Sequence, residues 1–305
     1  MIDRVDRFAS RYREIVDDYD AFTAALVRPP RNTFRVNTIK ATIPEVVDRF
    51  GKAGLSLTPI PWYEEAFAVD SPDALSATLE RFLGTIYIGE PASMLPPLVI
   101  APELQAAEIV FDACAAPGSK TTQAAAIMRN RGTIVANDRS FGRIRALQFN
   151  IHKFGAINTI ITNYELHRFP KITFDVIMLD APCSSSGTVR KSPKLIDSWN
   201  LNVSLGYAER QMDLLLRTFD MLRPGGTLVY STCSIAPEEN EGVIDHLVRS
   251  RAARVVPLEL PNFRFAPGVT EWNGREFSPG VIYCGRVWPH HNDTDGFFVA
   301  KVMSC

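Results

Sequence analysis

Short apolar runs alternate with helical patterns from Glu108 onward, and no other feature constrains the fold of this chain as strongly. The runs cover Ile109 to Ala113, Thr133 to Ala136, Ile157 to Ile161, Phe174 to Leu179 and Gly226 to Tyr230. Because they lack strict apolar–polar alternation, they are typical of strands that are buried on both faces. With helical patterns between them, they predict a doubly wound α/β fold around a mostly parallel sheet.

Helical patterns fill most of the intervals between these runs. They cover Lys120 to Met128, Phe141 to Phe154, and the region of Tyr207 to Leu222, which is ended by Arg223-Pro224-Gly225-Gly226. Near the C-terminus, Val281 to Cys284 and Phe297 to Val302 predict antiparallel strands that complete the sheet. Ligands of such sheets bind at the carboxyl ends of the strands, so motifs at those ends are the candidates for function.

The first part of the chain has a different pattern, which predicts a separate small domain. Apolar residues at helical spacing predict a helix over residues 1 to about 27, and Arg28-Pro29-Pro30 ends it. A strand over Phe34 to Ile39, a helix over Pro44 to Phe50 and a strand over Leu55 to Ile60 follow. This β-α-β unit ends near Gly84, so we divide the chain into an N-terminal α+β domain, residues 1–85, and a catalytic domain, residues 86–305.

Composition places the chain among globular proteins and excludes several classes. Of its 305 residues, 46% are apolar and 22% are charged, and no apolar run is long enough to cross a bilayer. The N-terminus has no apolar run of the signal-peptide type, so we expect a cytoplasmic protein. The scattered cysteines form no CxxC pair, which argues against disulfides and against a structural zinc site. These cysteines are Cys114, Cys183, Cys233, Cys284 and Cys305. We expect reduced thiols and no bound metal.

The distribution of charge leaves two interpretations open. The net charge of −1 and the pI near 6.5 argue mildly against a nucleic-acid partner. Three stretches, however, carry basic residues without an intervening acid: Arg28, Arg31, Arg35 and Lys40; Arg139, Arg143, Arg145 and Lys153; and Arg190, Lys191 and Lys194. They fit either an ordinary solvated face or a surface that follows a phosphate backbone.

A loop with one glycine follows the first predicted strand, and it has the character of a ligand-binding turn. It reads Asp112-Ala113-Cys114-Ala115-Ala116-Pro117-Gly118-Ser119-Lys120-Thr121. Its small residues let a ligand approach the backbone at the start of a helix, and Asp138, twenty residues past Gly118, is suitably placed to hold a ribose diol. The Gly-Lys-Thr order of a phosphate loop and the GxGxxG of a dinucleotide fold are absent. From spacing alone, a nucleoside-binding loop and a helix-starting turn with a structural acid both remain open.

Two cysteines follow adjacent predicted strands on the same ligand side of the sheet. The fourth strand ends in Asp180-Ala181-Pro182-Cys183 and the fifth in Ser231-Thr232-Cys233. A free cysteine is usually a small buried hydrophobe, but both of these loops are polar. A thiolate that adds to carbon 6 of cytosine makes carbon 5 nucleophilic, and an acid such as Asp180 assists at nitrogen 3. The pattern therefore indicates covalent pyrimidine chemistry, with Cys233 or Cys183 as the nucleophile.

Taken together, the motifs of the chain resemble those of the RsmB-like (Sun-type) RNA cytosine-5 methyltransferases. The segments that carry this resemblance are DACAAPGSKT, LDAPCSSSGT and VYSTCSIAPEENEGV, with Phe34-Arg35-Val36-Asn37-Thr38, Glu90-Pro91-Ala92-Ser93-Met94 and Gly296-Phe297-Phe298-Val299-Ala300. Their order and spacing make the set specific, and the resemblance covers nearly the whole chain. The compact length, without an appended RNA-binding module, resembles the short archaeal members of the family, whose substrate is tRNA. The resemblance implies a class I methyltransferase core with a seven-stranded sheet, and a small RRM-like N-terminal domain that helps to hold RNA.

The resemblance also implies roles for individual residues. Cys233 attacks carbon 6, Cys183 assists product release, and Asp180 contacts the base beside Lys120. The residues implied to bind S-adenosylmethionine are Cys114, Ala115, Ala116, Pro117, Gly118, Ser119, Lys120, Asp138, Arg143, Glu165 and Asp180. Glu165 stands where the family more often has aspartate. Lys120 as a helix cap, Arg143 as a solvated side chain and the acids after Cys233 as a helix first turn are the structural alternatives.

Several functions compete with RNA cytosine methylation. A DNA cytosine-5 methyltransferase would use Cys183 as nucleophile, but it has no paired TCS loop and needs a large target-recognition insertion. A small-molecule methyltransferase would not need the N-terminal domain, and an RNA-binding assembly factor would not need both cysteines. We therefore expect a monomeric enzyme that methylates unpaired or easily flipped cytidines of tRNA, with rRNA as the alternative substrate.

Overall fold

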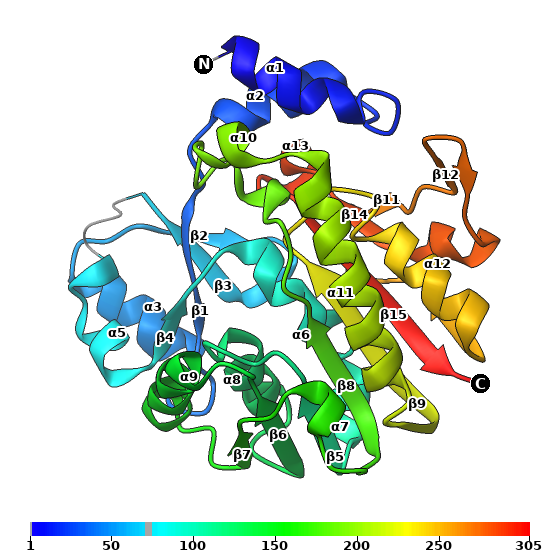
Figure 1. Ribbon diagram of the computed structural model, residues 1–305. Helices are drawn as coiled ribbons and strands as arrows, with labels where there is room; N and C mark the ends of the chain where they lie inside the picture. The colour runs from blue at the N-terminus through cyan, green and yellow to red at the C-terminus, as the bar shows by residue number, and fades with distance from the viewer. Residues whose placement is uncertain (1, 71–74) are drawn as a thin grey trace.

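The computed structural model describes residues 2–70 and 75–305, and one large sheet organises most of them (Figure 1). Its five parallel strands lie in the order β9-β8-β5-β6-β7. They are β5 (Ile109–Asp112), β6 (Thr133–Asn137), β7 (Thr159–Thr162), β8 (Phe174–Asp180) and β9 (Leu222–Thr232). Antiparallel β15 (Phe297–Ser304) and β14 (Gly285–Val287) continue the sheet beyond β9. The predicted mostly parallel seven-stranded sheet is confirmed, and short strands β10 (Ala253–Val256) and β11 (Ala266–Pro267) extend it.

Helices cover both faces of this sheet, as the doubly wound prediction requires. Alternate residues of β8 point to opposite faces, so Ile177 and Val176 belong to different cores. The first core contains residues of α11 (Leu201–Phe219) and α12 (Glu241–Ser250), and the second contains residues of α6 (Leu95–Val99), α8 (Ser119–Ile127) and α9 (Phe141–Phe154). This burial on both faces explains why the strands lacked apolar–polar alternation.

The N-terminal sheet differs from the predicted β-α-β unit. It is antiparallel, in the order β2-β3-β1-β4, and packs α3 (Ile43–Lys52) on one face. Its strands are β1 (Asn32–Val36), β2 (Leu57–Ile60), β3 (Tyr63–Val69) and β4 (Ile86–Ile88). The sequence did not reveal β3, because its residues are buried on both sides: Phe67 packs in the core with α3, whereas Ala66 and Ala68 pack in the core with α8. The small sheet therefore shares a core with the large one.

The predicted single helix at the N-terminus is also wrong, because the segment forms two helices. They are α1 (Ile2–Ala9) and α2 (Tyr19–Val27), with a short 3₁₀ turn (Ser10–Tyr12) between them. Asp18 accepts a hydrogen bond from the backbone N–H of Ala21 at 2.9 Å, which starts α2 as a separate element. Both helices lie beside α10 (Leu195–Ser198) and α13 (Pro289–Asn292) at one end of the molecule (Figure 1).

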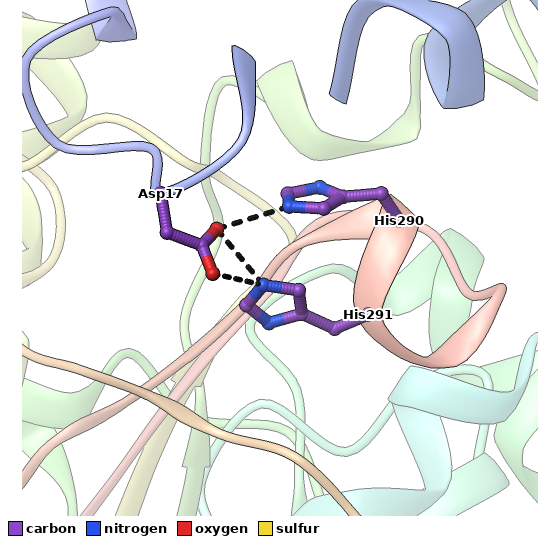
Figure 2. A group of neighbouring side chains, drawn as sticks. All are labelled: Asp17, His290 and His291. Carbon is purple, nitrogen blue, oxygen red and sulfur yellow. Dashed lines mark hydrogen bonds and ion pairs between the residues drawn. The ribbon is translucent and has the colours of Figure 1, made fainter. Parts of the chain in front are cut away.

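Asp17, between the two N-terminal helices, ties this segment to α13 (Figure 2). Its carboxylate lies 3.0 Å from Nε2 of His290 and 2.9 Å from Nε2 of His291. Partial burial acts to raise the pKa of Asp17, but the two imidazole hydrogen bonds outweigh it and hold the pKa at about 2. These hydrogen bonds therefore join two segments that are more than 270 positions apart in the sequence. None of the helices in the described ranges is long and apolar enough to span a membrane.

Candidate active site

The two predicted cysteines meet at the carboxyl ends of β8 and β9. Parallel pairing sets Asp180 opposite Ser231, so both loops leave the sheet at the same edge. The Sγ atoms of Cys183 and Cys233 lie 3.1 Å apart, and both residues are half-buried. The Oγ of Ser185 lies 3.5 Å from Sγ of Cys233. Tertiary structure thus places two free thiols in contact at one edge of the sheet.

The surroundings of the two thiols favour Cys233 as the more acidic one. The hydrogen bond between the sulfur atoms lowers the pKa of Cys233 and raises that of Cys183 well above its ordinary value. Burial raises the pKa of Cys233, whereas the Ser185 hydroxyl and the Lys120 ammonium lower it, and the net shift is downward. A thiolate at Cys233 that accepts a hydrogen bond from Cys183 fits these shifts. Because the thiolate is the reactive form of cysteine, the direction of these shifts favours Cys233 over Cys183 as a candidate nucleophile.

A partly buried ion pair lies beside the thiols. Nζ of Lys120 lies 2.6 Å from Oδ2 of Asp180, and the Ser231 hydroxyl donates to Oδ1 at 2.8 Å. Burial acts to lower the pKa of Lys120, but the Asp180 carboxylate outweighs it and the pKa is raised. Lys120 also lies over the Phe297 ring, 5.7 Å from its centre. The ammonium thus points toward the site, which excludes the alternative that Lys120 is a helix cap on the surface.

The predicted cofactor loop, from Cys114 to Lys120, connects β5 to α8. Gly118 has φ of +104°, a backbone conformation that side chains rarely adopt, and a Cβ there would lie 3.0 Å from Cδ1 of Leu147. Arg143 spans the loop: it donates to the carbonyl of Ala116 and lies 3.2 Å from Oδ2 of Asp138. Arg143 is therefore an exposed side chain that also bridges the loop and the acid.

A cavity of about 580 Å³ opens beside this loop. Four of the residues predicted to bind the cofactor line it: Cys114, Asp138, Arg143 and Glu165. Ala115, Ala116, Pro117, Gly118, Ser119, Lys120 and Asp180 do not line it. Glu165 is exposed at its rim. The cavity also has lining residues that sequence reasoning missed, among them Tyr164, Pro182, Tyr207 and Leu214. Tyr207 and Leu214 lie on α11, which is far along the chain from the loop, so local patterns did not reveal them.

Backbone hydrogen bonds of Gly187 and Gly296 connect the cysteine loops to the start of β15. The N–H of Gly187 donates to the carbonyl of Cys233, and the N–H of Gly296 donates to the carbonyl of Gly187, both at 2.9 Å. A Cβ at Gly187 would lie 2.1 Å from the Gly296 oxygen, so a side chain has no room there. This close approach explains the glycine in each of the two motifs, and it holds the thiol loops against the sheet.

Much of the basic residue pattern has a structural role. Arg35 is buried and donates to Oγ1 of Thr122 at 2.7 Å, so it joins the small sheet to α8. Arg190 is buried as well and donates to the carbonyls of Arg28 and Thr294 at 3.1 and 2.6 Å. The members of the three stretches that stay exposed include Arg139, Arg145, Lys191 and Lys194. The phosphate-following surface stays a prediction for these exposed residues.

The cluster of Asp17, His290 and His291 has the residue types of a metal site, but the groups around it do not fit a bound metal. In the described part of the chain, Asp17, His290 and His291 form the one group whose three ligand atoms lie within 4.8 Å of one another. Arg264, however, lies 2.6 Å from Oδ2 of Asp17. Nδ1 of each histidine is buried without a hydrogen-bond partner, whereas a metal-bound imidazole donates that N–H. We therefore assign the group to docking of the N-terminal helices.

Glu90, which is half-buried, and Asp295, which is buried, form an acid pair. The backbone N–H of Asp295 donates to Oε1 of Glu90 at 2.8 Å, and both carboxyl oxygens of Asp295 are buried without a hydrogen-bond partner. Burial, with the neighbouring Asp295 carboxyl, raises the pKa of Glu90 to about 7. Burial raises the pKa of Asp295 to about 6, although Arg190 and Lys191 oppose it. The folded protein therefore holds protons here that the unfolded chain releases near pH 4.

This acid pair predicts a stability that falls as the pH rises. Between the unfolded pKa values near 4 and the folded values of about 6 and 7, the folded state binds more protons, so the free energy of unfolding decreases with pH. We expect Asp295→Asn to flatten this slope and to increase the free energy of unfolding at pH 8 by about 1–2 kcal/mol. Urea unfolding at pH 5 and pH 8 measures both effects.

The control is Asp48→Asn, which changes an exposed acid paired with Lys52 and should change neither the slope nor the free energy of unfolding at pH 8. An unchanged slope in Asp295→Asn would contradict the raised pKa values of the acid pair.

Comparisons with known proteins agree with this geometry. A family model described as 16S rRNA methyltransferase RsmB/F matches residues 99–303, and one for the N-terminal domain of 16S rRNA methyltransferase RsmF matches residues 5–91. The chain is 39% identical to the ribosomal RNA small subunit methyltransferase F of Citrobacter koseri, over 97% of this chain and 62% of that protein. It is 37% identical to the tRNA (cytosine(49)-C(5))-methyltransferase of Pyrococcus abyssi, over 97% of this chain and 95% of that protein.

Solved structures agree with the fold. A methyltransferase homolog protein from Pyrococcus horikoshii superposes with a TM-score of 0.86 at 34% identity, over 100% of this chain and 98% of the other. NSun6 from the same organism has a TM-score of 0.81 at 22% identity, over 98% of this chain and 97% of the other. The second likeness concerns the fold alone. The chain spans about 62% of the length of the ribosomal relatives it matches.

Proposed function

The chain belongs to the RsmB/F family of methyltransferases, and from this premise we propose that it transfers a methyl group to carbon 5 of cytidine in RNA. The observation that carries the proposal is the contact between Cys233 and Cys183, 3.1 Å apart, beside the Lys120–Asp180 ion pair. The names of two relatives support it, because one acts on ribosomal RNA and the other on carbon 5 of a tRNA cytosine.

In the proposed reaction, Cys233 is the nucleophile. Its thiolate forms a bond to carbon 6 of the flipped cytosine, and the electrons of the ring double bond move toward carbon 5 as nitrogen 3 gains a proton or a hydrogen bond. Asp180 lies beside the thiols and serves at nitrogen 3, held in place by Lys120 and Ser231. Carbon 5 of the resulting enamine is then electron-rich enough to accept a methyl group.

Release of the product requires the reverse changes. Water takes the proton from carbon 5, and the electrons of that C–H bond restore the ring double bond. The bond between Sγ of Cys233 and carbon 6 breaks with its electron pair on sulfur, so Cys233 leaves as a thiolate. Cys183 is the proposed helper in this step, because its sulfur lies against that of Cys233 and its raised pKa keeps it a thiol that donates a hydrogen bond. The two cysteines thus divide attack and release between them.

The cavity beside Cys114 fits S-adenosylmethionine, which supplies the methyl group when it is bound. Oδ2 of Asp138 is buried at this cavity, 3.2 Å from Arg143, and a carboxylate oxygen with two lone pairs is able to accept a further hydrogen bond from a ribose hydroxyl. Tyr164, Leu166 and Leu214 add apolar and aromatic lining for a purine. Glu165 at the rim is the proposed partner of the adenine amine, and the loop from Cys114 to Lys120 approaches through its backbone.

The proposed substrate is tRNA, with ribosomal RNA as the second candidate. The tRNA-modifying relative is matched along 95% of its own length, and the ribosomal relatives are the observation that favours the second candidate. We further propose that residues 1–85 contact the RNA, and that the protein works as a monomer in the cytoplasm. The target cytidine is unpaired or easily flipped, because a thiol reaches carbon 6 only outside the base stack.

Transfer of labelled methyl groups into bulk RNA tests the proposed activity. We expect the purified protein to label RNA from cells that lack the gene, and bisulfite sequencing of RNA with and without the gene to identify the cytidine. Signal in tRNA supports the first substrate and signal in ribosomal RNA the second. Binding of RNA without any transfer would instead identify a non-catalytic assembly factor and overturn the proposal.

A further inference from the structure

Glu239, six residues after Cys233, is a buried acid that the reaction above does not use. Its carboxyl accepts four hydrogen bonds, although the residue is 0% exposed. The donors are the backbone N–H of Ser184 at 2.8 Å, the Ser184 hydroxyl at 2.5 Å, the Ser234 hydroxyl at 2.8 Å and the Gln211 amide at 3.2 Å. One side chain thus satisfies four polar groups in the protein interior.

The donors to Glu239 come from both cysteine loops. Ser184 follows Cys183 in the chain and Ser234 follows Cys233, so a single carboxyl bonds to the residue next to each thiol. Gln211, on α11, also donates to the carbonyl of Pro182 at 2.8 Å. The network therefore connects both cysteine loops to each other and to a helix that lines the cofactor cavity.

Neighbouring acids of the same segment have different partners. Glu238 lies 2.5 Å from Nη2 of Arg11 and accepts from the Trp272 indole at 2.8 Å. Glu241 forms a buried ion pair with Arg286. Glu239 makes no ion pair in the described part of the chain, and its partners are hydroxyl and N–H donors alone. The helix-first-turn interpretation, which treats these acids alike, therefore fails for Glu239.

A carboxylate satisfies all four donors at once, because each of its two oxygens accepts two hydrogen bonds. The N–H of Ser184 and the NH₂ of Gln211 face Oε2 and are unable to accept. A carboxamide at this position therefore has to turn its NH₂ toward the hydroxyls of Ser184 and Ser234, which must then accept instead of donate. Hydrogen bonds to a charged acceptor are stronger than those to a neutral one, so removal of the charge weakens the connection between the two loops.

We propose that Glu239 is a positioning residue that holds the two cysteine loops in register, so that the thiol of Cys183 faces the sulfur of Cys233. The expected effect of Glu239 on methylation turnover rests on the proposed function, whereas its expected effect on the pKa of Cys233 does not. When the register is lost, the contact between the two sulfur atoms, which lowers the pKa of Cys233, is lost with it.

The experiment compares Glu239→Gln with Glu238→Gln, its matched neighbour. Alkylation of Cys233 by iodoacetamide is followed by mass spectrometry as a function of pH, without RNA or cofactor. We expect the midpoint of the Glu239→Gln profile to move to higher pH, with the Glu238→Gln profile like that of the wild type. In the methylation assay, kcat of Glu239→Gln should fall by about 10- to 100-fold with an unchanged KM for S-adenosylmethionine. Glu239→Asp, which keeps the carboxyl, should recover part of kcat.

The outcomes separate the inference from the proposed function. Wild-type protein that does not methylate RNA overturns the function, while the alkylation profiles still test the positioning role. A Glu239→Gln protein with the wild-type alkylation profile overturns the inference, whether or not kcat falls. If Glu239→Gln does not fold, Ser184→Ala removes one donor and should shift the profile in the same direction; no shift there counts equally against the inference.

Discussion

Replacing Cys233 by alanine is expected to reduce RNA methylation by on the order of 10⁴-fold or more. In the proposed mechanism, no other described group replaces Cys233 as the nucleophile that bonds to carbon 6. The same variant should lose covalent capture of RNA that contains a mechanism-based cytosine analogue, measured as a denaturant-resistant protein–RNA band. RNA binding itself should remain, because the sulfur contributes little to the affinity for the phosphate backbone.

Cys183→Ala is the matched control for this prediction, since its sulfur lies only 3.1 Å away. We expect it to keep capture and to release the product slowly, so that the covalent complex accumulates with normal substrate. The opposite pattern, in which Cys183→Ala loses capture and Cys233→Ala keeps it, would assign the nucleophile as in DNA cytosine-5 methyltransferases. Normal methylation by Cys233→Ala would rule out a covalent mechanism that uses Cys233.

Asp180→Asn is expected to have the second largest effect, with kcat lower by roughly 10²- to 10⁴-fold. The amide no longer shares a proton with nitrogen 3, and it leaves the Lys120 ammonium buried without its carboxylate partner. Loss of one member of a fully buried pair costs about 3–5 kcal/mol, but the Asp180 side chain is 33% exposed, so we expect about 1–3 kcal/mol of destabilisation.

The double variant Asp180→Asn with Lys120→Met separates catalysis from stability. Removing the stranded ammonium should restore much of the free energy of unfolding, whereas kcat should stay low. Thermal or urea unfolding and single-turnover methylation measure the two quantities. An Asp180→Asn protein that is destabilised but fully active would show that the pair only supports the fold.

Large parts of the fold were readable because they depend on local patterns. The strand that ends at Asp180 was predicted from Phe174 onward, and the structure has it over Phe174–Asp180. By contrast, β3 was missed because Ala66 and Phe67 face different cores, so neither apolar alternation nor a long apolar run marks the strand. The helix expected up to Leu222 ends at Phe219, and β9 begins at Leu222 and includes the Pro-Gly-Gly turn.

Sequence patterns located the side chains that follow strand ends, but they did not reveal contacts between distant segments. Cys183 and Cys233 were placed side by side from their strands alone, because neighbouring parallel strands end at one edge. The wall that Tyr207 contributes to the cavity, the bridge formed by Arg143 and the four hydrogen bonds to Glu239 were not readable. Each depends on the packing of an element far away in the chain.

The sequence by itself determined the class of sheet, the edge at which ligands bind and the thiols that stand there, because periodicity and strand-end chemistry act over a few residues. Only the tertiary structure decided the sulfur separation, the burial of Arg35 and Arg190, and the acid that joins the two cysteine loops. The physical reason is that hydrogen bonds and burial depend on which surfaces meet, and contacts between residues dozens or hundreds of positions apart leave no periodic trace in either segment.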